Sequence, residues 1–421
     1  MRFEALADWL AWQQAAHPVA VDPGLERVGE VWRRLAPARP RAVLTIGGTN
    51  GKGSVAATLE SILAEAGYDT GLFTSPHLLR YHERIRVRRR EVDDAALLSA
   101  FARIDAARGD VSLTYFEWNT LAALVIFADE RVDAAVLEVG MGGRLDAVNL
   151  PDPDVAAVVS VGIDHCEYLG ATLEQIGAEK AGIFRPGRPA VFGSREMPAS
   201  IARAAAERGA LLRRLGVDFD YVERADGWDY VGTGSRRREL PLPVLAGARQ
   251  LANAATALAV LEAAEPVVLV GDEAVRTGLQ RVRLPGRFQV VPGDPEWILD
   301  VAHNADAARA LAASLAARPR RGSTIAVCGI LADKDAAAIA QALTGRVGRW
   351  IAVGLPAPRG LPAEELARRL AGAGATRVTA AQDVAAGCEL AARTCAPGDR
   401  IVVFGSFLTV GPALAHLGLA A

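Results

Sequence analysis

The chain has 421 residues, of which 51% are apolar and 23% charged, and its formal net charge is −2 at pH 7. This length predicts two or three domains. No apolar run reaches the roughly 18 residues that are needed to cross a bilayer. The small net charge gives no electrostatic reason to expect a nucleic-acid partner. The four cysteines, Cys166, Cys328, Cys388 and Cys395, have no paired spacing, which argues against a zinc site or a disulfide framework. The N-terminus is acidic and amphipathic and does not resemble a signal peptide, so we expect a cytoplasmic protein with no membrane or nucleic-acid partner.

Short apolar runs alternate with longer helical patterns from residue 41 onward, which predicts parallel strands with helices on both faces of the sheet. The first series has expected strands at 41–48, 68–75, 132–140 and 153–164, and expected helices at 52–67, 115–130, 172–184 and 250–264. Residues 284–288 (LPGRF) are expected to form a turn out of the first domain.

A second series follows that turn, with expected strands at 296–302, 323–331, 349–355 and 399–407, and expected helices at 305–317, 336–347 and 364–374. The prediction is therefore an α/β protein with two domains. Residues 1–288 form a P-loop-type, doubly wound and mostly parallel sheet domain, and residues 289–421 form a smaller α/β domain.

Two arginine-rich stretches lie outside this pattern. Residues 84–90 (RIRVRRR) fit an exposed strand or hairpin, the alternative being a site for a polyanionic substrate tail, and residues 232–240 (GTGSRRREL) fit loops or a small β insertion.

The strongest local signal is TIGGTNGKGS, residues 45–54, between an expected strand and an expected helix. Glycines allow backbone N–H groups to approach a phosphate, the helix N-terminus favours anions, and Lys52 adds a positive charge. The spacing is not that of a standard P-loop motif, because glycine is absent at Ile46 and the hydroxyl comes one place late, at Ser54. We predict nucleotide binding here, the alternative being a tight turn.

Polar residues end three of the expected strands, namely Ser75, Glu138 and His165. The carboxyl ends of parallel strands meet at one edge of a sheet, where such folds bind ligands. A carboxylate there needs a cation, and magnesium bound to ATP prefers oxygen ligands. Taken alone, His165 fits a structural, hydrogen-bonded residue better, because magnesium is not the usual partner of a histidine.

Only three of the 47 basic residues are lysines, Lys52, Lys180 and Lys334, and the rest are arginines. A lysine amine can lose its proton or be modified, which a guanidinium cannot do, so a retained lysine indicates chemistry. The alternatives are chance and, for Lys180, an ordinary exposed helical position.

In the second domain LDVAHN, residues 299–304, ends a strand. Asp300 and His303 are candidates to reach a ribose, a base or an incoming amine, the alternative for Asp300 being a helix cap. Ser406 is a candidate to bind a substrate carboxylate.

Taken in order, these segments resemble the folylpolyglutamate synthase and dihydrofolate synthase family, a branch of the Mur-ligase-like ATP-dependent ligases. The matching segments are GTNGKGS, TSPHLLRYHERIRV, TYFEWNTLAAL, LEVGMGGRLDAVN, GIDHCEYLG, EKAGIFR, NAATAL, LPGRFQ, LDVAHN, GILADKD and GSFLTVG. The ordered set is specific, although Leu408 stands where relatives often have a polar or aromatic residue.

The resemblance implies a role for each matching position. The ATP phosphates would be held by Thr49, Asn50, Gly51, Lys52, Gly53 and Ser54, and the nucleotide would also meet Asn253, Arg287 and Asp300. One Mg²⁺ would bind Ser75 and Glu138, and a second would bind Glu138, His165 and a carbamylated Lys180. The pterin side would be bound by Asp22, by Thr114, Tyr115, Phe116 and Glu117, and by Leu145, Asp146 and Ala147, while His303 and Ser406 would lie near the glutamate.

The activity implied is the addition of L-glutamate to dihydropteroate and to tetrahydrofolate glutamates through an acyl phosphate, with His303 assisting the amine. Asp22 favours a bifunctional enzyme, because members that use dihydropteroate tend to carry aspartate in that loop; the alternative is a monofunctional folylpolyglutamate synthase. We expect a monomer.

Three rival functions share some of these features. A cell-wall ligase of the Mur type shares the phosphate loop and chemistry, but its separate N-terminal domain is missing ahead of residue 45. A non-catalytic ATP-binding module would not need the second-domain motifs. A dehydrogenase is disfavoured because GTNGKGS lacks the G-x-G-x-x-G spacing.

Overall fold

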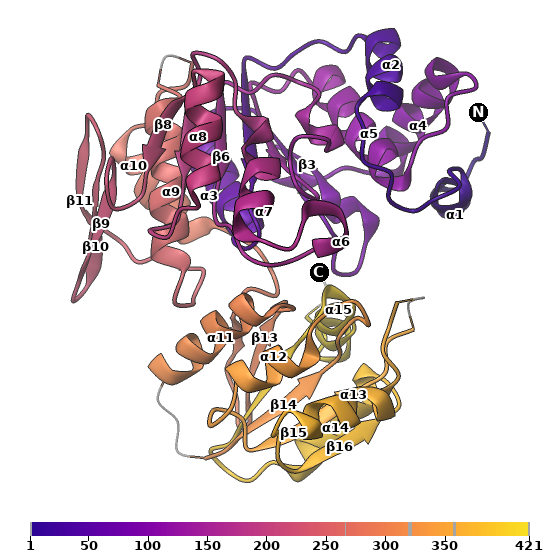
Figure 1. Ribbon diagram of the computed structural model, residues 1–421, viewed down its shortest axis with the longest axis vertical. Coiled ribbons are helices and arrows are strands. Elements are labelled where there is room, and N and C mark those ends of the chain that lie inside the picture. Colours follow the sequence, from indigo (N-terminus) through magenta and orange to yellow (C-terminus); the bar gives the residue numbers. More distant parts are fainter. Residues whose placement is uncertain (1, 266, 319–321, 357–358, 420–421) are drawn as a thin grey trace. The chain divides into compact units, whose positions relative to one another are not determined.

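The computed structural model describes residues 2–265, 267–318, 322–356 and 359–419 (Figure 1). The chain forms two compact units. The first consists of the chain up to Pro76 together with Tyr81–Val244 and Leu251–Arg283, and the second of His77–Arg80, Leu245–Gln250 and the chain from Leu284 onward. No helix in the described residues is long and apolar enough to cross a membrane.

The first unit is built on an eight-stranded sheet with the order β4-β3-β2-β5-β1-β6-β7-β8. The six strands β2, β5, β1, β6, β7 and β8 pair in parallel. At one edge β3 is antiparallel to both of its neighbours, β2 and β4. The strands are β1 (Ala42–Gly47), β2 (Thr70–Phe73), β3 (Ile85–Val87), β4 (Arg90–Glu91), β5 (Ala134–Glu138), β6 (Val155–Val158), β7 (Pro189–Phe192) and β8 (Leu211–Arg214).

Helices cover both faces of this sheet because alternate strand residues point to opposite sides. Val43 and Leu137 belong to a core formed with α4, α5 and α8, whereas Leu44 and Val136 belong to a core formed with α3, α9 and α10. The helices of the unit are α1 (Leu6–Ala15), α2 (Glu26–Leu35), α3 (Lys52–Glu65), α4 (Asp94–Arg108), α5 (Tyr115–Asp129), α6 (Cys166–Leu169), α7 (Leu173–Lys180), α8 (Ala199–Arg208), α9 (Gln250–Ala263) and α10 (Asp272–Arg281), with single 3₁₀ turns at Tyr81–Arg84, Ala147–Asn149 and Ala181–Ile183. The predicted doubly wound, mostly parallel sheet is confirmed.

The two arginine-rich stretches both form β structure. Residues 236–240 become β11 (Arg236–Leu240) of a small antiparallel sheet with β9 (Asp220–Arg224) and β10 (Gly227–Val231), which is the expected β insertion. In the other stretch Arg84 ends a 3₁₀ turn, and the residues after it form the β3–β4 hairpin, although Ile85 and Val87 are buried rather than exposed.

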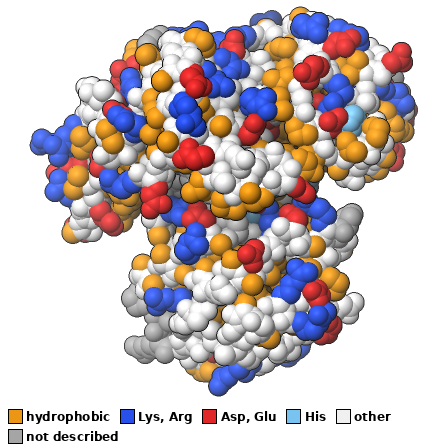
Figure 2. Space-filling model, in the orientation of Figure 1, with side chains coloured by type: hydrophobic (Ala, Val, Ile, Leu, Met, Phe, Trp, Pro, Cys, Tyr) orange, Lys and Arg blue, Asp and Glu red, His pale blue; other side chains and the backbone are white. Residues whose placement is uncertain are grey.

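Arginines of the hairpin are paired with carboxylates. Arg88 contacts Glu130 at 2.7 Å, Arg89 contacts Glu65 at 2.7 Å, and Arg86 pairs with the buried Glu60. Acidic and basic side chains are accordingly interspersed over the face shown in Figure 2. Arg86 and Arg89 also line a cavity of about 590 Å³ between α3 and the end of α10. The ion pairs give these arginines a structural role.

The second unit has a six-stranded sheet with the order β12-β13-β17-β14-β15-β16, in which only the edge strand β12 is antiparallel. Its core lies on both faces, with α11, α12 and α13 on one side and α14 and α15 on the other. Its elements are β12 (Gln289–Val291), β13 (Glu296–Asp300), α11 (Ala305–Ala317), β14 (Thr324–Cys328), α12 (Ala336–Ala342), β15 (Arg349–Val353), α13 (Ala363–Gly372), β16 (Val378–Ala381), α14 (Val384–Thr394), β17 (Arg400–Phe404) and α15 (Phe407–His416). The second α/β fold is likewise confirmed.

Candidate active site

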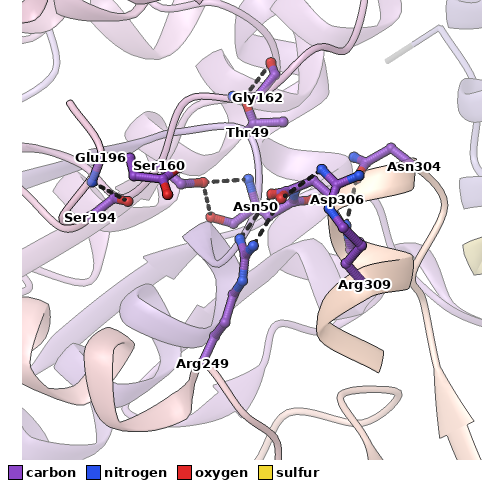
Figure 3. A network of polar contacts seen from close by, with 11 residues as sticks. Thr49, Asn50, Ser160, Gly162, Ser194, Glu196, Arg249, Asn304, Asp306 and Arg309 are labelled. Carbon is purple, nitrogen blue, oxygen red and sulfur yellow. Dashed lines mark hydrogen bonds and ion pairs between the residues drawn. The ribbon is translucent and has the colours of Figure 1, made fainter. Parts of the chain in front are cut away.

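The glycine-rich loop lies between β1 and α3 and is anchored to the segment that follows β6. Thr49 N–H donates to the Ser160 carbonyl at 2.8 Å, and Asn50 N–H donates to the Ser160 hydroxyl at 3.0 Å. Gly162 N–H donates to the Thr49 hydroxyl at 2.9 Å (Figure 3). The loop therefore has a fixed shape before any ligand arrives.

Gly51 is the residue at which this loop turns into α3. Its φ is +90°, and a Cβ there would lie 2.7 Å from Oδ1 of Asn253 and 2.9 Å from Val159. Only glycine fits this conformation and this space. Asn253, which the family resemblance assigns to the nucleotide, thus lies directly against the loop. Gly53 and Ser54 are buried in the first turn of α3.

Two of the three lysines converge on this loop. The amine of Lys52 donates to the Gly48 carbonyl at 3.1 Å, and the amine of Lys180, from the last turn of α7, donates to the same oxygen at 3.1 Å. Lys180 is only 4% exposed. Burial and then the charge of Lys52 lower the pKa of Lys180 to about 7, against the opposing charges of Asp164 and Asp146. A substantial fraction of Lys180 is therefore a neutral amine near pH 7.

The expected strand-end residues occupy the carboxyl edge of the sheet. Glu138, 4% exposed, ends β5, and its Oε2 accepts from the Ser75 backbone N–H at 3.2 Å, just beyond β2. His165 lies immediately before α6, as its N-cap residue, in a left-handed conformation with φ of +51°, and its N–H donates to Asp164 at 2.9 Å. No three His, Cys, Asp or Glu residues gather as a metal site within the described part of the chain. The predicted magnesium ligands include a serine and a lysine, so the predicted sites do not require a cluster of three His, Cys, Asp or Glu residues.

The three segments assigned to the pterin side differ in what their side chains do. Thr114 and Glu117 form a capping box at the start of α5, and the Phe116 ring packs against Gly140. Asp146 accepts from the N–H groups of Met141 and Val148, both at 2.9 Å, and burial raises its pKa to about 6. Flanking residues Tyr115 and Leu145 are half-buried, and Ala147 is buried.

Asp22 is joined to the start of α5 by residues that were not expected from the sequence. Arg27 contacts Oδ2 of Asp22 at 2.7 Å and Oε1 of Glu117 at 3.1 Å, and His17 contacts the same Asp22 oxygen at 3.1 Å. His17 lies in the loop before Asp22, and Arg27 lies in the helix after it. This closeness to Asp22 along the chain is the only signal for either residue in the sequence.

In the second unit the strand-end residues are held by backbone contacts. Asp300 accepts from the N–H groups of Phe288 and Ala302, both at 2.8 Å, and burial raises its pKa although the charge of Arg287 opposes the rise. The residue that caps α11 is Asn304, which is labelled in Figure 3. The alternative role of Asp300 as the helix cap is therefore wrong.

Two further side chains of the second unit have defined surroundings. His303 directs Nδ1 to the Val301 carbonyl at 2.8 Å, so in the neutral ring Nε2 carries the lone pair. Ser406 caps α15 by accepting from Leu408 N–H at 3.1 Å. Phe407, which the sequence did not single out, lies 5.2 Å from the Arg287 guanidinium and 6.4 Å from the His303 ring.

Comparisons with known proteins give a consistent family. Residues 46–261 match the Mur ligase middle domain and residues 286–407 match the Mur ligase glutamate ligase domain. The dihydrofolate synthase/folylpolyglutamate synthase of Escherichia coli K12 is 44% identical over 406 residues, covering 96% of this chain and 94% of that protein. The same-named protein of Haemophilus influenzae is 38% identical over 425 residues, covering 96% of each.

Solved structures agree over nearly the whole length. E. coli FolC in complex with DHPP and ADP superposes with a TM-score of 0.94 at 43% identity, covering 99% of this chain and 98% of that one. A bifunctional folylpolyglutamate synthase/dihydrofolate synthase with Mn, AMPPNP and L-glutamate bound gives 0.92 at 45% identity, covering 99% and 98%. The chain belongs to the dihydrofolate synthase/folylpolyglutamate synthase family of Mur ligases.

Proposed function

We propose that this protein is an ATP-dependent ligase that joins L-glutamate to dihydropteroate and to tetrahydrofolate glutamates, releasing ADP and phosphate. The observation that carries the proposal is the convergence of Lys52 and Lys180 on the Gly48 carbonyl, in a loop that leads into α3. The relatives named above bind ADP, AMPPNP, Mn, DHPP and L-glutamate, which are the expected classes of ligand.

In the first unit, the backbone from Thr49 to Ser54 would hold the ATP phosphates, with the Lys52 amine as a point charge. Asn253 would contact the nucleotide from beside Gly51. From the second unit Arg287 and Asp300 would contact the nucleotide, and Ser406 would lie near the glutamate. Positioning and charge neutralisation supply most of the catalysis in phosphoryl transfer, so these groups need no covalent role.

The residues present fit magnesium. Ser75 offers a hydroxyl and Glu138 a carboxylate, which are oxygen donors of the kind that Mg²⁺ prefers. The two residues are adjacent, because the Ser75 backbone N–H donates to Oε2 of Glu138 at 3.2 Å. One ion would bind these two residues, and a second would bind Glu138, His165 and carbamylated Lys180. The ions would supply neutralisation of the phosphate charge.

Lys180 fits carbamylation because its pKa of about 7 leaves much of the amine neutral. The nitrogen lone pair forms a bond to the carbon of CO₂, one C=O π pair moves to oxygen, and the nitrogen loses a proton to solvent. The product is a carbamate anion, which would replace a buried cationic group with oxygen ligands beside Lys52.

The reaction would begin when a substrate carboxylate oxygen attacks the γ-phosphorus of ATP and ADP leaves. The glutamate amine then attacks the acyl phosphate carbon, phosphate leaves with the carboxylate-derived oxygen, and an amide forms. The amine must lose a proton, and Nε2 of His303 is the candidate acceptor, since Nδ1 is bound to Val301.

On the pterin side, Asp22, the Thr114–Glu117 segment and the Leu145–Ala147 segment would bind dihydropteroate. Asp22 supports the bifunctional assignment over a monofunctional folylpolyglutamate synthase. We also propose that the protein is a monomer and that it acts in the cytoplasm.

The first test is ADP release by the purified protein with Mg²⁺, ATP and L-glutamate, with dihydropteroate or tetrahydrofolate added separately. Turnover with both substrates is expected. Turnover with tetrahydrofolate alone would show a monofunctional enzyme, and no turnover with either, in folded protein that binds ATP, would overturn the proposed function.

A second test addresses the acyl phosphate. With ¹⁸O in the substrate carboxylate, one labelled oxygen should pass to the released phosphate in each turnover. Unlabelled phosphate under verified amide formation would exclude this route.

A further inference from the structure

The carboxylate of Asp22 has one oxygen fixed and the other open. Oδ2 is contacted from two sides, by Nε2 of His17 at 3.1 Å and by a terminal nitrogen of Arg27 at 2.7 Å. Oδ1 has no hydrogen bond within the described part of the chain, and the side chain of Asp22 is 38% exposed. A donor from a ligand can therefore reach Oδ1 without displacing either neighbour.

His17 is itself held in place. Its Nδ1 lies 3.0 Å from the hydroxyl of Ser112, and its side chain is only 9% exposed. An ionised carboxylate only accepts hydrogen bonds, so Nε2 must carry the proton that points to Asp22. In the neutral ring Nδ1 then accepts from Ser112. The imidazole is a fixed bridge between the residues before α5 and the Asp22 loop.

Arg27 makes a second bridge to the same helix. It donates to the Asp22 carbonyl at 2.9 Å and to Oε1 of Glu117 at 3.1 Å. Glu117 is buried, and its other oxygen accepts from Thr114 N–H at 2.7 Å. The planar guanidinium thus spans the Asp22 loop and the capping box, which a lysine amine could not do. Figure 1 shows α1, α2 and α5 grouped in this part of the first unit.

We propose that His17 and Arg27 are positioning residues that orient Asp22 for the pterin of dihydropteroate. The proposal rests on the proposed function, in which Asp22 binds that substrate. Residues 16–25 form no helix or strand, so a free aspartate in this segment would lose side-chain entropy on binding. Because His17 and Arg27 already fix Oδ2, the Oδ1 atom is oriented toward the N–H donors of the pterin before binding. The loss of side-chain entropy on binding is therefore avoided.

A matched pair of substitutions tests His17. The amide nitrogen of glutamine can take the place of Nε2, whereas that of asparagine can take the place only of Nδ1. His17→Asn should raise KM for dihydropteroate about tenfold, as expected for loss of a charge-assisted hydrogen bond. His17→Gln should stay within about threefold of the unchanged protein. In both, kcat and the KM for tetrahydrofolate should change less than about twofold.

Arg27→Lys is the second variant and should also raise KM for dihydropteroate about tenfold, because one amine cannot bridge Asp22 and Glu117. Equal losses with both pterin substrates, accompanied by a lower thermal midpoint, would indicate a merely structural role and overturn the proposal.

A double-mutant cycle shows whether His17 acts through Asp22. If it does, Asp22→Asn with His17→Asn should be no worse than Asp22→Asn alone. Fold-changes that multiply would overturn the proposal, as would a His17→Asn protein that behaves like the unchanged one while Asp22→Asn is impaired. An unimpaired Asp22→Asn protein would instead refute the assignment of Asp22 in the proposed function.

Discussion

Two lysine amines share the Gly48 carbonyl, but only Lys180 is buried. Burial removes the hydration of its charge, and the nearby Lys52 charge acts in the same direction, so the pKa of Lys180 falls to about 7. At neutral pH about half of the Lys180 amines are then unprotonated, compared with fewer than about one in a thousand for an ordinary lysine. This environment gives Lys180 a reactivity that the exposed arginines of the chain do not have.

The same environment predicts how stability depends on pH. Between about pH 7 and the ordinary lysine pKa, the unfolded chain holds a proton at Lys180 that the folded protein does not. The free energy of unfolding should therefore rise with pH in this window, by up to about 1.4 kcal/mol per pH unit, and the burial penalty is fully present below it.

Lys180→Met should remove this contribution. Urea unfolding of the metal-free proteins in CO₂-free buffer, from about pH 6 to about pH 10, should show a shallower slope and higher stability at the acid end for the variant. Parallel curves for the two proteins would contradict the lowered pKa.

At the scale of the element, the loop before α3 depends on one glycine. Gly51→Ala would place a Cβ 2.7 Å from Asn253 and 2.9 Å from Val159, in addition to the strain of a positive φ. We expect a loss of about 2–4 kcal/mol in stability and at least tenfold weaker binding of an ATP analogue, because both the loop and Asn253 must shift.

Gly67→Ala is the matched control for this prediction. Gly67 follows α3 with a φ of +87°, but a Cβ there meets nothing within 4 Å. The control should lose stability from backbone strain alone and keep its nucleotide affinity. Calorimetric titration with AMPPNP separates the two effects, and equal affinities for both variants would contradict the role given to Gly51.

The central elements could be predicted from the sequence because their apolar runs are buried on both sides. β1 and β5, for example, consist entirely of buried residues. Strands β8 and β16 were missed, since edge positions leave Leu211–Arg214 and Val378–Ala381 without a continuous buried run. The helix expected at 336–347 ends at Ala342, where a turn containing Gly345 replaces its last part.

The candidate site was predictable only where it follows strand ends. Ser75 and Glu138 are in contact because parallel strands bring their carboxyl ends together. His17 lies in an irregular loop and Arg27 in the helix that follows, and tertiary contacts with Ser112 and Glu117 decide where their side chains point. No periodicity in the sequence encodes such contacts.

At the scale of the whole molecule, the second unit is not a single stretch of chain. Ser314 of α11 accepts from Ala248 N–H at 2.9 Å, and Arg249 pairs with Asp306 at 2.9 Å (Figure 3). Leu78 packs against the core formed with α14 and α15. Segments 77–80 and 245–250 therefore complete this unit, although each lies far from residue 284 in the sequence.

Gly411 in α15 allows a test of this arrangement. A Cβ at this position would lie 2.1 Å from the Leu78 carbonyl oxygen, a backbone atom that cannot rotate away. Gly411→Ala should therefore destabilise the second unit by about 1–3 kcal/mol, despite the higher helix propensity of alanine. Gly372→Ala, at the end of α13, meets nothing within 4 Å and should stabilise by up to about 1 kcal/mol. Differential scanning calorimetry of the full chain distinguishes the two results. If Gly411→Ala proved as stable as the control, segment 77–80 would not pack on α15, and the second unit would be complete without it.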